Sequence, residues 1–155
     1  ESSKIPIDIS EKEYCGSIET VTVKSIEIKV YSRSLLVLEK MRAVCQSHPD
    51  YKHKNPKKSK SRARDFFDIE QLYSKSLKEG KQKDLIKEMQ KHFRNVLDAK
   101  DVDLAILALV TSDKLFVERL SNAWKEVETT VSGKKQSFDY YLDTFQYLVD
   151  QLEIQ

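Results

Sequence analysis

Residues 34–45 read Ser-Leu-Leu-Val-Leu-Glu-Lys-Met-Arg-Ala-Val-Cys, and residues 64–68, after a basic loop, read Arg-Asp-Phe-Phe-Asp. Both stretches carry apolar residues at helical spacing, which predicts two helices joined by the loop. On the first helix the neighbours of Lys40 at three and four positions away are all apolar, namely Leu36, Val37, Ala43 and Val44. Such a lysine either lays its aliphatic stem across the apolar stripe with its ammonium in water, or is a cation held at the wall of a cleft.

The second helix opens with two acids on one face. Asp65 and Asp68 are three residues apart, so they point the same way, while the apolar side consists of Phe66, Phe67, Ile69 and Tyr73. The two acids either form a site with Lys40 or only complement the positive end of the helix dipole. Arg64, four residues before Asp68, is either a support for that site or a partner in a surface ion pair.

The lysine helix, the glycine-free loop and the acidic helix occur in the order found in one enzyme family. Glu39-Lys40-Met41-Arg42-Ala43 resembles a Glu-Lys-x-x-Ala helix motif, and Arg64 to Asp68 resembles an Arg-Asp-x-x-Asp helix motif. Together they resemble the AbiEii family, toxin-type nucleotidyltransferases of bacterial toxin–antitoxin and phage-defence systems. The resemblance covers residues 4–75, and the helical remainder is similar only in general character.

This resemblance implies a site and a reaction. Lys40, Asp65 and Asp68 are the expected catalytic residues, with Lys40 and Arg64 also binding the nucleotide. The expected cofactors are Mg²⁺ and an NTP, since nucleotidyl transfer uses divalent cations that bridge the triphosphate and Mg²⁺ prefers carboxylate oxygens. The implied reaction moves an NMP from NTP to an acceptor, for which tRNA is the candidate, and the implied protein partner is an antitoxin.

A first strand is expected at residues 4–10, where Ile5, Ile7 and Ile9 alternate with polar residues and Pro6 favours a sheet edge. The resemblance assigns Asp8 on this strand as a metal-binding third carboxylate, whereas the pattern alone fits an exposed aspartate equally well. The family's glycine-rich turn and Asp-x-Asp pair are missing before this strand. We therefore interpret the chain as the C-terminal portion of a nucleotidyltransferase, inactive alone, whose missing N-terminal part is a further partner.

The periodicity predicts an α+β fold with a small partial sheet followed by an all-α helical bundle. Further strands are expected at 18–23 and 26–31, and His48-Pro49 should end the lysine helix. The remaining helices are expected at 83–98, at 102–110, after a Ser112 cap and up to Gly133, and after a Ser137 cap. The Asp101-Val102-Asp103 triplet is interpreted as a cap. We place the domain boundary at residue 78, with a nucleotidyltransferase-like part at 1–78 and the bundle at 79–155.

The net charge is only +2, but the charge is unevenly distributed along the chain. Residues 52–64 form a basic segment with eight basic side chains: Lys52, His53, Lys54, Lys57, Lys58, Lys60, Arg62 and Arg64. Such a segment either contacts RNA phosphates or is a solvated loop. This leaves a rival interpretation of the whole chain, in which it is a non-catalytic helical module that binds protein or RNA through the basic loop.

The remaining polar residues suggest no further site. Cys15 and Cys45 have no metal or disulfide spacing and are expected to be reduced, and His48, His53 and His92 are expected in loops and on the surface. No apolar run is long enough to cross a membrane and no signal-peptide pattern occurs, which favours a cytoplasmic location.

Overall fold

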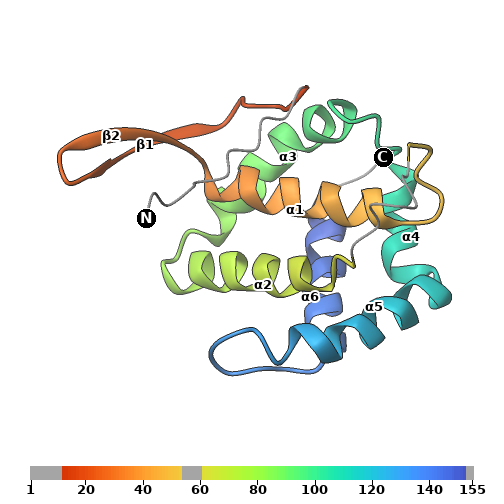
Figure 1. The fold of residues 1–155 in the computed structure, drawn as a ribbon. Coiled ribbons are helices and arrows are strands. Elements are labelled where there is room, and N and C mark those ends of the chain that lie inside the picture. The colour runs from red at the N-terminus through yellow and green to blue at the C-terminus, as the bar shows by residue number, and fades with distance from the viewer. Residues whose placement is uncertain (1–11, 54–60, 153–155) are drawn as a thin grey trace, which may run out of the picture.

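The computed structural model describes residues 12–53 and 61–152 of the chain. Within these ranges the chain forms one β-hairpin and six helices, which confirms the α+β prediction with a small sheet. Figure 1 shows the hairpin reaching out beyond the helices, which pack together into a single body. The predicted strand at 4–10, including Asp8, and residues 54–60 of the basic loop lie outside the described residues.

The hairpin consists of β1 (Ile18–Val23) and β2 (Ile26–Tyr31), whose bounds match the predicted strands. The strands are antiparallel with Val23 opposite Ile26, and Lys24 and Ser25 make the two-residue turn with positive φ angles of 49° and 68°. By this register one face of the hairpin carries Val21, Val23, Ile26, Ile28 and Val30, with Glu19 opposite Val30 as its polar residue. No described helix covers the outer part of that face, and Ile26 is 64% exposed.

The helical body is built around α1 (Arg33–Ser47), which packs against α2 (Ala63–Lys78) on one side and α3 (Gln82–Asp98) on another. The Ser32 hydroxyl caps the start of α1 by accepting from the Leu35 N–H. His48 takes extended geometry at the other end, as expected for the residue before Pro49. The stripe facing the core is fully buried, with Leu35, Val37, Leu38, Met41, Val44 and Cys45.

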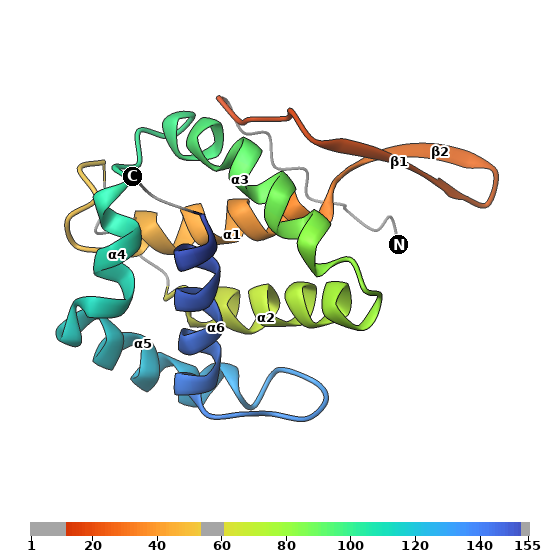
Figure 2. The same ribbon diagram turned by 180° about the vertical axis from the view of Figure 1, so that it is seen from behind.

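Three further helices complete the body: α4 (Ala105–Ser112), α5 (Lys114–Val127) and α6 (Phe138–Gln151). Figure 2 shows α6 running across α2, where Phe66 of α2 packs against Phe138 and Phe145 with ring centroids 5.2 and 5.0 Å apart. These contacts place the aromatic stripes in the core.

Both predicted ends of α5 were wrong. Asp113, not Ser112, caps α5, because its carboxylate accepts from the N–H groups of both Leu115 and Phe116 while the Ser112 hydroxyl bonds back into α4. The helix ends at Val127, six residues before Gly133. Gly133 lies in the following loop, where its φ of 94° favours glycine.

Two other predicted caps are confirmed in part. Asp103 accepts from the Ala105 N–H, the first of α4, at 2.9 Å, although the N-cap position of α4 is Leu104. Ser137 occupies the N-cap position of α6, although its side chain makes no capping hydrogen bond.

The surface placement of the histidines was wrong for two of the three. His48 is 1% exposed, with its ring edge against Phe116, since the end of α1 is packed against α5. His92 is also buried, and its Nδ1 lies 2.7 Å from the Tyr14 hydroxyl, because the segment before β1 crosses α3 at this point. His53 is exposed, as predicted.

Of the two free cysteines, Cys45 is buried and Cys15 is exposed. In the ranges that the structure describes, no helix combines the length and the apolar character needed to cross a bilayer. The boundary at residue 78 and the cytoplasmic location stay predictions.

Candidate functional site

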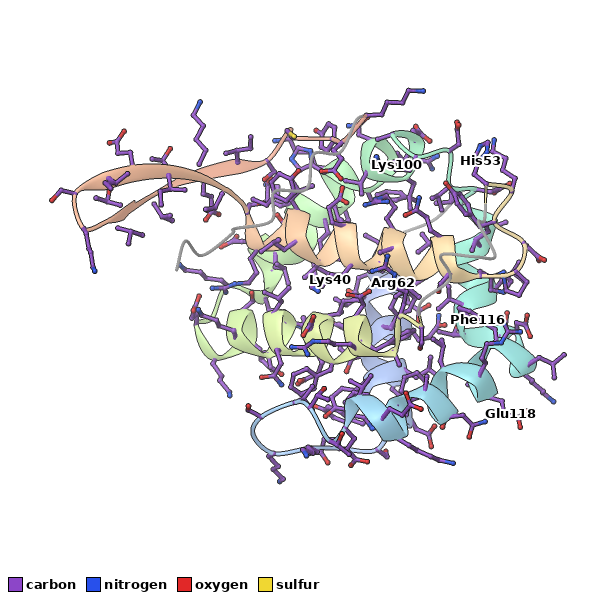
Figure 3. All side chains as sticks on the ribbon, viewed as in Figure 1. Lys40, His53, Arg62, Lys100, Phe116 and Glu118 are labelled. Carbon is purple, nitrogen blue, oxygen red and sulfur yellow. The ribbon has the colours of Figure 1, made fainter. Side chains whose placement is uncertain are left out.

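Ion pairs join α1 and α2, which run antiparallel, at two levels. The Arg33 guanidinium, at the start of α1, donates to both Glu79 carboxylate oxygens at 2.9 and 3.2 Å and to the Ser76 hydroxyl at 2.9 Å, near the end of α2. The second link lies about two turns along α1, where Lys40 meets the first turns of α2. Lys40 therefore lies between the two helices (Figure 3).

The Lys40 ammonium contacts both of the acids that the sequence singled out. Its Nζ donates to Asp68 Oδ2 at 2.7 Å and to Asp65 Oδ1 at 3.1 Å. The two carboxylates reach the same ammonium because they are three residues apart on one face of α2. The Lys40 ammonium is therefore paired with two carboxylates of α2 and does not extend into open water, while its placement at the wall of a cleft stays a prediction.

We call Lys40, Asp65 and Asp68 the Lys40 cluster. Its three side chains are partly shielded from water. The exposed fractions of the three side chains are 28%, 14% and 26%. Burial alone lowers the pKa of Lys40, but the hydrogen bond with Asp68 and the charge of Asp65 outweigh it, so the pKa of Lys40 lies above its ordinary value. Lys40 is thus a permanent cation and not a proton acceptor near neutral pH.

Two arginines flank the cluster. Arg64 Nε lies 3.9 Å from Asp68 Oδ1 and its side chain is 59% exposed, which makes it a loose surface partner. Arg62 Nη1 lies 3.6 Å from Asp65 Oδ2, and the sequence analysis missed this contact. The signal was present, because Arg62 stands three residues before Asp65.

The glutamate of the Glu-Lys-x-x-Ala segment takes no part in the cluster. Glu39 Oε2 accepts from Arg42 Nε at 2.9 Å, and both side chains are largely buried. Arg42 also donates to Gln46, whose amide donates to the Tyr51 hydroxyl at 3.1 Å, and Tyr51 donates to the Lys100 carbonyl at 2.8 Å. This chain of hydrogen bonds ties the middle of α1 to the start of the α1–α2 loop and to the α3–α4 connection.

A family model described as nucleotidyl transferase AbiEii toxin, type IV toxin–antitoxin system, matches residues 2–144. The chain belongs to the AbiEii family. The match extends well beyond residue 75, so α3, α4, α5 and the first half of α6 are part of the AbiEii homology. Comparisons with curated proteins and with solved structures gave no significant match.

Nucleotidyltransferases generally act on an NTP with a divalent metal, which is held by a set of oxygen ligands. Asp65 and Asp68 already bind the Lys40 ammonium, and no group of three His, Cys, Asp or Glu side chains suited to a metal occurs among residues 12–53 and 61–152. A metal ion needs several oxygen ligands in fixed geometry. The described residues therefore do not form the family's metal site, and Asp8, the predicted metal ligand, lies outside them.

Proposed function

We propose that this AbiEii chain contributes the phosphate-binding side of a nucleotidyltransferase that moves an NMP from NTP to an acceptor. The observation that carries the proposal is the Lys40 ammonium held by Asp65 and Asp68 of the neighbouring helix. In this proposal Lys40 acts on the phosphates, while Asp65 and Asp68 set its position. The family assignment supports the reaction class.

The proposed role of Lys40 is electrostatic. A lysine that stays protonated can stabilise negative charge developing on phosphate oxygens, and a site partly closed to water makes that charge more effective. One ammonium between two carboxylates leaves a formal charge of −1, which by itself repels a triphosphate. Arg62 and Arg64 at the edge of the cluster change this to +1, and we propose that these arginines complete the phosphate contact.

The metal-binding acids of the reaction are proposed to lie in an upstream part of the same protein, with Asp8 as the third carboxylate. The hairpin supports this proposal. Isolated two-stranded hairpins are only marginally stable in water, and this one leaves Val23 and Ile26 half or more exposed. A further layer of a nucleotidyltransferase sheet would cover that apolar face.

The finer assignments rest on the family context. We propose Mg²⁺ as the metal, an antitoxin protein as the partner in a toxin–antitoxin pair, and tRNA as the acceptor. The basic segment 52–64 is the proposed RNA contact. The structure describes four of its basic residues, namely Lys52, His53, Arg62 and Arg64.

The test uses the protein with whatever residues its gene encodes before Glu1. Transfer of labelled nucleotide from each of the four NTPs to total tRNA is measured for the wild type, Lys40→Met, Lys40→Arg and Lys87→Met. Lys87 is exposed on α3 and serves as the matched lysine control. Lys40→Met should lower the rate by about 10²–10³-fold, as expected for loss of one preorganised charge, and Lys87→Met should not.

The rival function, a non-catalytic module, makes the opposite prediction. The same ion pairs are what a purely structural clamp between α1 and α2 would require. If no acceptor is labelled, or if folded Lys40→Met transfers nucleotide as fast as the wild type, the catalytic role is rejected and the clamp remains.

A further inference from the structure

A polar pocket lies on the side of α2 turned away from α1. It has a volume of about 640 Å³ and is formed by α2, the loop between α5 and α6, and the first turn of α6. Figure 1 shows this loop running below α2. Its volume falls in the range of small-molecule sites, roughly 300–1,000 Å³.

The inner part of this pocket holds a buried acid. Glu70 is only 6% exposed, and no ion pair joins it to a cationic side chain in the parts of the chain that the structure describes. Its carboxylate accepts from the Tyr140 hydroxyl at 3.2 Å, from the Gln71 amide at 2.7 Å and from the Ser74 hydroxyl. A carboxylate has about four acceptor positions, so Glu70 keeps capacity for one further donor.

The outer part of the pocket is basic and aromatic. Lys75 and Lys78 come from the last turn of α2 and Lys134 from the loop, and none of the three forms an ion pair with a described acidic residue. Tyr140 also lines the pocket and is 43% exposed, so part of its surface is open to a ligand. The pocket thus combines three cations, an aromatic side chain and a buried acceptor.

We propose that this pocket binds a nucleoside phosphate, which goes beyond the function proposed for the Lys40 cluster. The lysines contact the phosphates, Tyr140 stacks on the base, and Glu70 accepts a hydrogen bond from a base N–H or amino group. The ligand is either a free nucleotide or the terminal nucleotide of a single strand, since both present the same groups.

The direct test is a titration of the ¹⁵N-labelled chain followed by NMR, with no divalent metal present. The probes are AMP, inorganic phosphate and a single-stranded tetranucleotide. AMP should shift the backbone signals of Ser74, Lys75, Lys78, Gln136 and Tyr140. A tetranucleotide that binds these residues more tightly than AMP identifies the strand end as the ligand, and the reverse order identifies the free nucleotide.

Variants separate the three contacts. Tyr140→Leu should weaken AMP binding about tenfold, whereas Tyr140→Phe, which keeps the ring, should weaken it less. Lys75→Gln with Lys78→Gln should weaken binding about fivefold or more at low salt and less at high salt, with Lys87→Gln as the matched control. Glu70→Gln should weaken AMP binding without changing the binding of inorganic phosphate.

Two results would overturn the proposal. The first is a set of AMP-induced shifts that leaves the pocket residues unchanged. The second is inorganic phosphate matching AMP in both affinity and pattern of shifts, because the lysines would then be a simple anion surface with no base contact. Loss of binding in Glu70→Gln counts only if that variant keeps the wild-type NMR spectrum, which shows that it is folded.

Discussion

Replacement of Lys40 by methionine should destabilise the chain even where no nucleotide is present. Methionine keeps the unbranched, apolar part of the side chain, so the substitution removes mainly the ammonium. The ammonium bridges two carboxylates at 2.7 and 3.1 Å, and its loss leaves Asp65 and Asp68 with only the longer, more exposed contacts to Arg62 and Arg64. Both the lost attraction and the new repulsion favour unfolding.

The magnitude follows from the burial of the three side chains. Fully exposed ion pairs contribute about 0–1 kcal/mol, and removal of one member of a buried pair costs about 3–5 kcal/mol. With exposed fractions of 28%, 14% and 26%, the Lys40 cluster lies between these cases. We expect Lys40→Met to lower the free energy of unfolding by about 2 kcal/mol.

Urea unfolding measures this change directly. Trp124, the single tryptophan, is buried against Tyr141 with ring centroids 4.8 Å apart, and its fluorescence reports on the core. For an m-value of about 2 kcal/mol/M, the midpoint should fall by about 1 M. Asp68→Asn combined with Lys40→Met should be less destabilising than the sum of the two, since the side chains are in direct contact.

Lys87→Met provides the baseline, because Lys87 is exposed and substitutions at such positions usually change stability by less than about 0.5 kcal/mol. The reasoning fails if Lys40→Met is as stable as Lys87→Met, or if the double variant shows strict additivity. Either result would mean that the ammonium is not held by the two carboxylates in solution.

Three further predictions concern other groups. The pKa of Lys40 is raised in the native state, so its ion pairs contribute their full stabilisation below pH 10.5, the ordinary pKa of lysine. This stabilisation is lost as the pH rises through the higher native pKa. The difference in unfolding free energy between wild type and Lys40→Met should therefore disappear only in urea titrations at strongly alkaline pH. A thiol reagent should modify Cys15 in the native chain and Cys45 only after unfolding, because Cys15 is exposed whereas burial raises the pKa of Cys45 to about 12; counting of reacted thiols in buffer and in urea checks this. Asp113→Ala should cost about 1 kcal/mol in urea unfolding through loss of the α5 cap, whereas Asp113→Asn should cost less, and equal stability of all three proteins would contradict the cap.

Local sequence signals were sufficient for most element positions. The bounds of β1 and β2 followed from alternation of apolar residues, and the end of α1 from His48-Pro49. The α5 cap was misplaced by one residue, because Ser112 and Asp113 are both good caps and only the backbone path decides which hydroxyl or carboxylate reaches the free N–H groups.

The amino-acid sequence alone predicts the order of the helices and strands, the family motifs, and the apolar face of each helix. The element that packs against each face depends on how the helices are arranged in space. Lys40 has apolar neighbours along its own helix whether its ammonium reaches water or not, and it meets Asp65 and Asp68 only because α2 runs antiparallel beside α1. The burial of His48 and the lack of an ion pair between Glu70 and any described cation have the same origin, since the helical period shows which residues turn inward but not which element covers them.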